Sequence, residues 1–260
     1  MGLAENNLAK ARATIIDLDQ NGIRIPLQEN SLYKDIYEMM LNQNENYAKL
    51  YHELSTSQKK NILFVEDTYT QIYKVAWLKL NEVDFDENNI DEVFLNNADF
   101  DIYRKGNKDN LQGFLNNPYM DEWKHKIIVG LFDFDDAYEN YQKLKDWEIK
   151  SEDETNGLYK KRKECNVYAL MLPIPDFRKN IAGKSQIVKQ LEVELLLPDN
   201  KIQEAYGDSD YATEKIIEGL EIPKINNKKD FWKKVLILSK NDFEAFTPLF
   251  TTLNTILSSC

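Results

Sequence analysis

The 260-residue chain has few cysteines and no long apolar run. Its two cysteines, Cys165 and Cys260, form no CxxC pair and show no spacing typical of a zinc site or a disulfide framework. No stretch approaches the roughly 18 consecutive apolar residues that a membrane-spanning helix needs. The sequence also shows no apolar signal segment, so we expect a cytoplasmic protein that does not interact with a membrane.

Negative charge outnumbers positive charge. The chain has 33 Lys and Arg residues against 44 Asp and Glu residues, which gives a formal net charge of −11. This balance disfavours non-specific binding of nucleic acid over the whole surface, because such binding depends on Lys and Arg neutralising phosphates. A local basic groove or a metal-bridged substrate remains compatible with it.

The most informative stretch is residues 125–144, which read HKIIVGLFDFDDAYENYQKL. Its apolar, β-branched part at 127–132 predicts a strand buried on both faces. Three acids follow, and apolar residues then recur at helical spacing from 136 to 145. In open α/β sheets, ligand-binding groups gather at the carboxyl ends of strands. Because neighbouring carboxylates repel unless a cation neutralises them, this turn is a candidate divalent-metal site. The acids are Asp133, Asp135 and Asp136.

A second stretch repeats this pattern. The apolar segment NILFV at residues 61–65 predicts a short buried strand, and a helical pattern follows at 68–80. Glu66 and Asp67 come directly after the strand. If the two strands are neighbours in a parallel sheet, Glu66 and Asp133 lie side by side.

A third pair of acids lies further along the chain. The segment 190–197, QLEVELLL, alternates polar and apolar residues and predicts a half-exposed strand. Glu192 and Glu194 share one face of that strand. They either face solvent or add a carboxylate to the candidate metal site.

Together these patterns predict an α/β fold with a largely parallel central sheet flanked by helices. We expect an N-terminal hairpin at 14–27 and a helix from Leu32 to Leu54 (residues 1–58), an α/β core at 59–200 and a helical C-terminal cap at 201–260. The remaining predicted strands are 92–95, 157–163 and 166–172, and the remaining predicted helices are 108–115, 208–220, 230–238 and 241–257.

The predicted α/β core contains one dense run of basic residues. This run has two interpretations. It either contacts the phosphates of a nucleic acid or forms a solvated hairpin tip. The run consists of Lys160, Lys161, Arg162 and Lys163.

Carboxylates at the ends of adjacent strands suit hard cations, chiefly Mg²⁺, with Mn²⁺ as a substitute. Two such ions roughly 4 Å apart can stabilise both the attacking and the leaving oxygen of a phosphodiester. In the competing interpretation, the acids only cap the helices that follow them and bind nothing.

The two acidic motifs, NILFVE and IIVGLFDFDD, resemble the TOPRIM domain over about residues 60–200. This domain occurs in topoisomerases, in bacterial primases and in nucleases of the overcoming-lysogenization-defect (OLD) type. The resemblance implies that Glu66 acts as a general acid/base or a metal ligand, and that Asp133 and Asp135 are metal ligands. The OLD-type nucleases also use a later Glu and a Lys near the C-terminus. The positions that match here are Glu192 or Glu194, and Lys228 or Lys229.

The chain departs from that family in two places near Glu66. Asp67 stands where the family usually has Gly, and Thr70 stands where OLD-type members often have a further acid. These nucleases are commonly joined to an ATPase. The resemblance therefore implies an Mg²⁺-dependent endonuclease that cleaves DNA or RNA and meets an ATPase or regulator in trans, in anti-phage defence.

Other functions compete with this one. The segment NILFVED also resembles the first strand of receiver domains, which act as phosphorylation-switched interaction modules, although their phosphoacceptor Asp comes sooner along the chain. Phosphatases of the haloacid-dehalogenase type also place Asp-x-Asp after a strand, but near the N-terminus. A degenerate TOPRIM domain that binds metal and a partner protein without catalysis is a further alternative.

Overall fold

The computed structural model describes residues 59–67, 69–187, 189–207, 211–217, 220–225 and 228–259, together with residues 48, 51, 52, 54, 55 and 57. The chain divides into two units, residues 1–58 and 59–260. Every helix and strand named below belongs to the second unit. The predicted hairpin at 14–27 lies outside the described residues, as does most of the predicted helix from Leu32 to Leu54.

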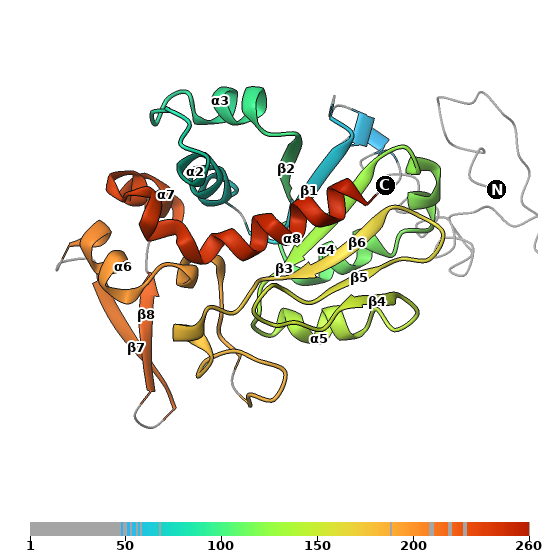
Figure 1. Ribbon diagram of the computed structural model, residues 1–260. Helices are drawn as coiled ribbons and strands as arrows, with labels where there is room; N and C mark the ends of the chain where they lie inside the picture. Colours follow the sequence, from blue (N-terminus) through green and yellow to red (C-terminus); the bar gives the residue numbers. More distant parts are fainter. Residues whose placement is uncertain are drawn as a thin grey trace, which may run out of the picture. The chain divides into compact units, whose positions relative to one another are not determined.

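A mixed sheet forms the centre of this unit (Figure 1). Among the described residues it has six strands in the order β2-β1-β3-β6-β5-β4. The first four are parallel to one another, β5 pairs antiparallel with β6, and β4 pairs antiparallel with β5. The α/β fold with a largely parallel sheet is therefore confirmed. The strands are β1 (Asn61–Val65), β2 (Phe100–Arg104), β3 (Ile127–Phe132), β4 (Glu148–Ser151), β5 (Tyr159–Lys161) and β6 (Val167–Met171).

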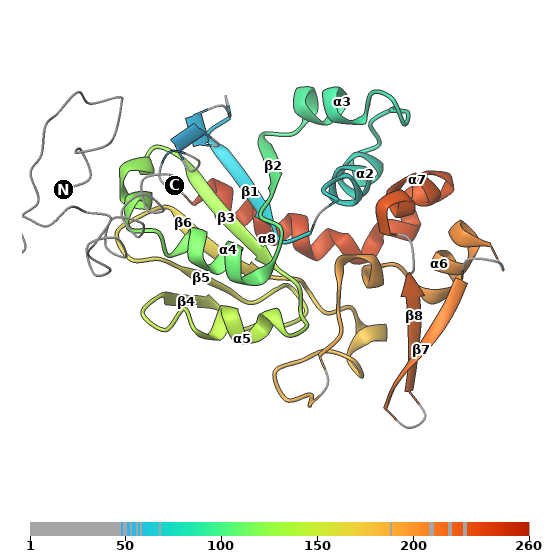
Figure 2. The same ribbon diagram turned by 180° about the vertical axis from the view of Figure 1, so that it is seen from behind.

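Helices cover both faces of the sheet. In both views, α2 and α8 lie on one face and α4 and α5 on the other (Figures 1 and 2). Among the described residues, no helix combines the length and the apolar character that a membrane crossing requires. The α-helices are α2 (Gln71–Leu80), α3 (Ile90–Asn97), α4 (Lys108–Leu115), α5 (Ala137–Gln142), α6 (Asp199–Tyr206), α7 (Phe231–Lys234) and α8 (Thr247–Ser258). The 3₁₀ helices are η3 (Pro118–Trp123), η4 (Asp176–Arg178), η5 (Val193–Leu196), η6 (Lys228–Asp230), η7 (Val235–Ile237) and η8 (Lys240–Phe246).

The central strands β1 and β3 are apolar because they are covered on both faces. Every residue of β3 is buried, and so are the last four residues of β1. The two strands pair in parallel, with Val65 opposite Leu131. This register brings the residues that follow both strands together at the carboxyl ends of the parallel strands.

Three sequence-based predictions are wrong. The segment predicted as a helix at 208–220 forms the strand β7 (Tyr211–Ile217), which pairs antiparallel with β8 (Leu220–Ile225). The segment 92–95, predicted as a strand, lies in α3. The segment 190–197 is not a strand but contains η5, in which Glu194 is buried together with its apolar neighbours instead of facing solvent.

The sheet ends at β4, a short strand that is mostly exposed. Its pairing with β5 shifts register between Ile149 and Ser151. Lys150 forms an ion pair with Glu148 at 2.6 Å on the same strand. Among the described residues β4 has no strand on its other side, and charged side chains flank this edge of the sheet.

Candidate metal centre

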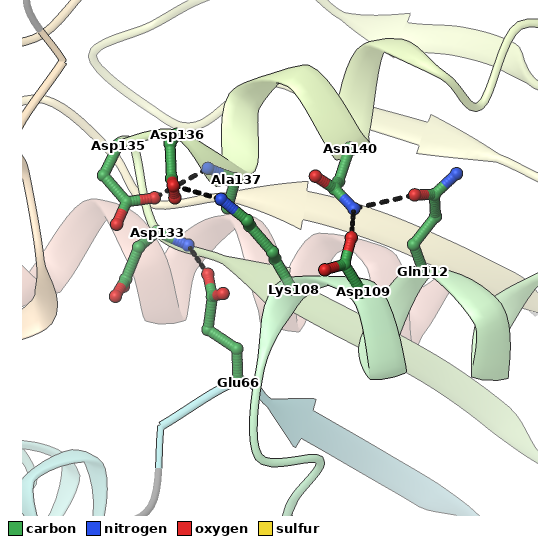
Figure 3. Close-up of polar contacts among 9 residues, drawn as sticks. All are labelled: Glu66, Lys108, Asp109, Gln112, Asp133, Asp135, Asp136, Ala137 and Asn140. Carbon is green, nitrogen blue, oxygen red and sulfur yellow. Dashed lines mark hydrogen bonds and ion pairs between the residues drawn. The ribbon is translucent and has the colours of Figure 1, made fainter.

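The topology places two acids at the carboxyl ends of neighbouring parallel strands. From β1 the chain crosses to β2 on one side and then returns to β3 on the other, so the strand order reverses beside β1. Ligands bind at such switch points in open α/β sheets. Glu66 follows β1, and its Oε1 accepts a hydrogen bond from the main-chain nitrogen of Asp133 at 2.5 Å (Figure 3). The structure thus brings together two acids that lie 67 residues apart.

The turn after β3 is held by the helix that follows it. Asp135 Oδ1 accepts a hydrogen bond from the Ala137 nitrogen at 2.8 Å, whereas Asp136, the N-cap residue of α5, makes no side-chain capping hydrogen bond. Asp136 instead forms an ion pair with Lys108 and is largely exposed. The side-chain nitrogen of the buried Asn140 donates to two acceptors on α4, at 2.7 and 2.8 Å, and so ties α5 to α4 (Figure 3).

The third pair of acids reaches this turn through a short main-chain bridge. Phe134 and Leu191 exchange main-chain hydrogen bonds of 2.9 and 3.2 Å, although the surrounding segment is not a strand. Glu192 follows the bridge directly. Glu194 is only 5% exposed, and its Oε2 has no hydrogen-bond partner.

Lys228 places a positively charged ammonium group beside these acids. It forms an ion pair with Glu192, and its Nζ lies 3.7 Å from Glu194 Oε1. Burial alone would lower the pKa of Lys228, but Glu194 and Glu192 raise it above its ordinary value. Lys229, the alternative named from the sequence, is exposed.

Asp67 has a partner that sequence reasoning missed. The hydroxyl of Tyr73 on α2 donates a hydrogen bond to Asp67 Oδ2. Tyr73 is 1% exposed, so the phenol is committed to this contact. Spacing offers a signal for it in retrospect, because Tyr73 lies on the buried face of the helix that follows the acid pair.

Burial and mutual repulsion raise the pKa values of five of these acids, which disfavours their charged forms. Burial and the neighbouring Asp135 raise the pKa of Glu66 to about 8, against the hydrogen bond from Asp133. Burial raises the pKa of Glu194 to about 7 and that of Asp67 to about 6. Burial, with the surrounding acids, also holds the pKa values of Asp133 and Asp135 above their usual range.

Most of these acids line a cleft of about 240 Å³, but Asp135 and Glu192 are not among its lining residues. Its polar floor contains Glu66, Asp67, Asp133, Glu194 and Lys228. The other lining residues are Tyr69, Ile72, Gly106, Asn107, Phe231 and Trp232.

The donor set fits a hard divalent cation in its chemistry. Asp133 is 6% exposed, and its Oδ1, like Glu194 Oε2, is buried without a hydrogen-bond partner. A buried carboxylate oxygen without a donor is costly unless a cation or a proton satisfies it. Carboxylate oxygens are the ligands that Mg²⁺ prefers. Within the described part of the chain, no three His, Cys, Asp or Glu side chains already form a metal-binding group. Cation binding therefore requires side-chain rotation, for which Glu66, now turned to the Asp133 amide, is placed.

The basic run does not join this site. Lys160 is 9% exposed and donates to two carbonyl oxygens at and just after the end of α5, at 3.1 and 3.2 Å. Arg162 donates to two carbonyl oxygens at and just after the end of α4, at 3.1 and 2.8 Å. Strand alternation turns both side chains inward, so the structure does not support them as nucleic-acid contacts. Lys161 pairs with Tyr168 near the start of β6. Lys161 and the nearby Lys163 therefore lie toward the amino ends of the parallel strands, away from the acids.

Comparisons with known protein families, with curated proteins and with solved structures find no match to this chain. The TOPRIM resemblance therefore rests on the two acidic motifs alone.

Proposed function

We propose that this protein is a Mg²⁺-dependent endonuclease of the TOPRIM type that hydrolyses phosphodiester bonds of DNA or RNA, with Mn²⁺ as a substitute ion. The observation that carries the proposal is the pair of buried, unpartnered carboxylate oxygens of Asp133 and Glu194 beside the Lys228 ammonium. If these acids only capped helices, we would not expect their carboxylate oxygens to be buried without a hydrogen-bond donor.

The acids divide into two roles in this proposal. Asp133, Asp135 and Glu194 would hold the cation, with Glu192 completing the group. When bound, Mg²⁺ polarises a phosphoryl oxygen and lowers the pKa of a coordinated water. Glu66 has a pKa of about 8, because it is buried among other acids. A carboxyl with such a pKa exchanges a proton near neutral pH, which suits a general acid/base.

Lys228 has an electrostatic role. Its ammonium is already oriented by Glu192 and borders the cleft. A fixed positive charge at this position stabilises negative charge that develops on a phosphoryl group in the transition state. Lys229 is exposed and does not line the cleft, so Lys228 is the better candidate for this role.

The resemblance to OLD-type nucleases extends the proposal to the biological role. Those nucleases are commonly joined to an ATPase. We propose that this chain acts in anti-phage defence under the control of an ATPase or another regulator in trans.

The test is cleavage of supercoiled plasmid and of total RNA with Mg²⁺ or Mn²⁺. Wild type is compared with Glu66→Gln and Asp133→Asn, which remove a charge and keep the side-chain size. Asp176→Asn is the matched control, because Asp176 is an exposed acid paired only with Lys179 on the surface. We expect cleavage by wild type and the control, and a loss of about 10²-fold or more in both site variants. Equal cleavage by all four proteins would overturn the assignment.

A second candidate is a metal-binding interaction module without catalysis, of the receiver type. The pairing of β1 and β3, with acids after both strands, favours it. Mg²⁺ binding measured by calorimetry separates the two. If wild type binds Mg²⁺, the site variants do not, and no substrate is cleaved, the interaction module is supported.

A further inference from the structure

The segment after Lys228 places aromatic side chains among lysines beside the acids. Residues 228–234 read KKDFWKK, and they form η6 and α7. Phe231 and Trp232 of this segment line the same cleft as Glu66 and Asp133. Basic side chains close to aromatic side chains are typical of surfaces that bind single-stranded nucleic acid.

The two aromatic residues have different environments. Phe231 is 1% exposed and stacks on Tyr206 with ring centroids 5.7 Å apart, so it anchors the segment in the core. Trp232 is only partly buried. Its ring has Lys233 Nζ at 5.5 Å from the centroid, and Lys233 also pairs with Glu87 at 2.5 Å. Phe231 therefore anchors a segment whose next residue, the partly buried Trp232, lines the cleft.

Tyr69 is a second partly buried aromatic residue on the cleft wall. Within the described part of the chain, neither its hydroxyl nor the Trp232 indole N–H takes part in a hydrogen bond. Their polar groups thus stay available to a ligand, while their rings give the cleft apolar walls.

A glycine forms a further part of the cleft wall. Gly106 and Asn107 connect β2 to α4, and Gly106 has a φ of +91°, which favours glycine. Without a Cβ at Gly106, this side of the cleft stays open to a bound chain. At about 240 Å³ the cleft is smaller than the pockets that enclose a drug-sized ligand, so it can receive only a small part of a polymer chain.

We propose that the cleft binds single-stranded nucleic acid, with one unpaired base stacked on Trp232 and the adjoining phosphate beside the Lys228 ammonium. Lys229 and Lys233 contact neighbouring phosphates. This inference rests on the proposed nuclease function and specifies its substrate: duplex regions are excluded, and Trp232 determines the preference through stacking.

The experiment measures binding and base contact separately, with the full-length chain. Fluorescein-labelled oligo-dT and a duplex of the same length are titrated in Ca²⁺ and in EDTA, and the affinity is read by anisotropy. The tryptophan emission is recorded in parallel with unlabelled oligo-dT. The proteins are wild type, Trp232→Ala, Trp232→Phe and the control Ile237→Ala, which changes an apolar residue that is 68% exposed and outside the cleft.

We expect wild type to bind oligo-dT more tightly than the duplex and to lose tryptophan emission on binding. Trp232→Ala should weaken oligo-dT binding by at least about fivefold, since stacking on an aromatic residue contributes this much per base. Trp232→Phe should keep the affinity and lose most of the quenching, because phenylalanine still stacks but is not the emitting indole. Ile237→Ala should behave as wild type.

Two results would overturn the proposal: equal affinity for oligo-dT and duplex, or quenching that persists in Trp232→Phe. If Trp232→Ala does not fold, the quenching arm of Trp232→Phe still decides. Failure of the nuclease function looks different. In that case oligo-dT binds and quenches as expected, but no cleavage appears with Mg²⁺ or Mn²⁺.

Discussion

At the scale of single residues, the acid group depends on neighbours that carry no charge. Tyr73 donates to Asp67 from inside the core, and the Asp133 amide donates to Glu66. Hydrogen bonds to a carboxylate favour its charged form and oppose the effect of burial. The position that holds Gly in the TOPRIM family thus holds, in this chain, an acid with its own dedicated donor.

Replacing Tyr73 by phenylalanine should lower the free energy of unfolding by about 1–3 kcal/mol, because Asp67 keeps its burial and loses its donor. Urea denaturation in EDTA measures the change. Tyr69→Phe is the matched control, since its hydroxyl makes no hydrogen bond with the described residues, and it should change stability by less than about 0.5 kcal/mol. Equal effects of the two substitutions would mean that the Tyr73–Asp67 contact contributes nothing.

At the scale of elements, Arg178 determines where Glu194 lies. Arg178 is 4% exposed and donates from Nε to the Leu195 carbonyl and from Nη2 to the Leu197 carbonyl, both at 2.9 Å. It also pairs with Asp199 at the start of α6 at 2.5 Å. These bonds hold η5, which carries Glu194, against the segment that follows β6.

Arg178→Ala should destabilise the protein by about 3–5 kcal/mol, because two buried carbonyl groups and an acid lose their donor. Arg178→Lys should recover only part of this, since an ammonium lacks the planar fork that reaches both carbonyls. Mg²⁺ affinity, measured by calorimetry on the folded variants, should fall as Glu194 loses its support. Lys179→Ala, at the next and exposed position, provides the comparison. Unchanged stability in Arg178→Ala would contradict this account of η5.

The sequence was sufficient for the strands that form the site and insufficient for the segments that complete it. The strands at 61–65 and 127–132 were predictable because they are continuous apolar runs covered on both faces. The helix from Lys108 to Leu115 was predictable in its observed bounds. The segments at 190–197 and 208–220 were not, because side-chain packing around Arg178 and pairing with β8 determine them, and both are long-range effects. For Phe231 and Trp232 the sequence predicted only a helix. Their position in the cleft was not predictable, because it depends on the packing of Phe231 against Tyr206.

At the scale of the whole molecule, the acid group couples stability to pH. A carboxyl whose pKa is higher in the folded than in the unfolded chain binds more protons when folded, between the two pKa values. The free energy of unfolding therefore falls as the pH rises through that interval. For Glu66 the interval runs from 4.5 to about 8. Asp133, Asp135 and Glu194 shift in the same direction.

In EDTA, the free energy of unfolding should therefore fall by about 2 kcal/mol or more between about pH 5 and about pH 8. Glu66→Gln should reduce this slope, because glutamine keeps an oxygen acceptor for the Asp133 amide and carries no charge. Added Mg²⁺ should restore stability at the higher pH in wild type, in proportion to its occupancy of the folded state. Urea titrations at several pH values measure all three effects, and stability that rises with pH in EDTA would refute the coupling.

The exposed strand β4 affects the whole molecule in another way. An open sheet edge presents unpaired main-chain groups to which a second copy can add a strand. Here the edge is short, carries Glu148 and Lys150, and changes register at Ile149. Each of these features opposes continued strand addition. β4 thus protects the protein against edge-to-edge aggregation, although Ile149 on it is 56% exposed.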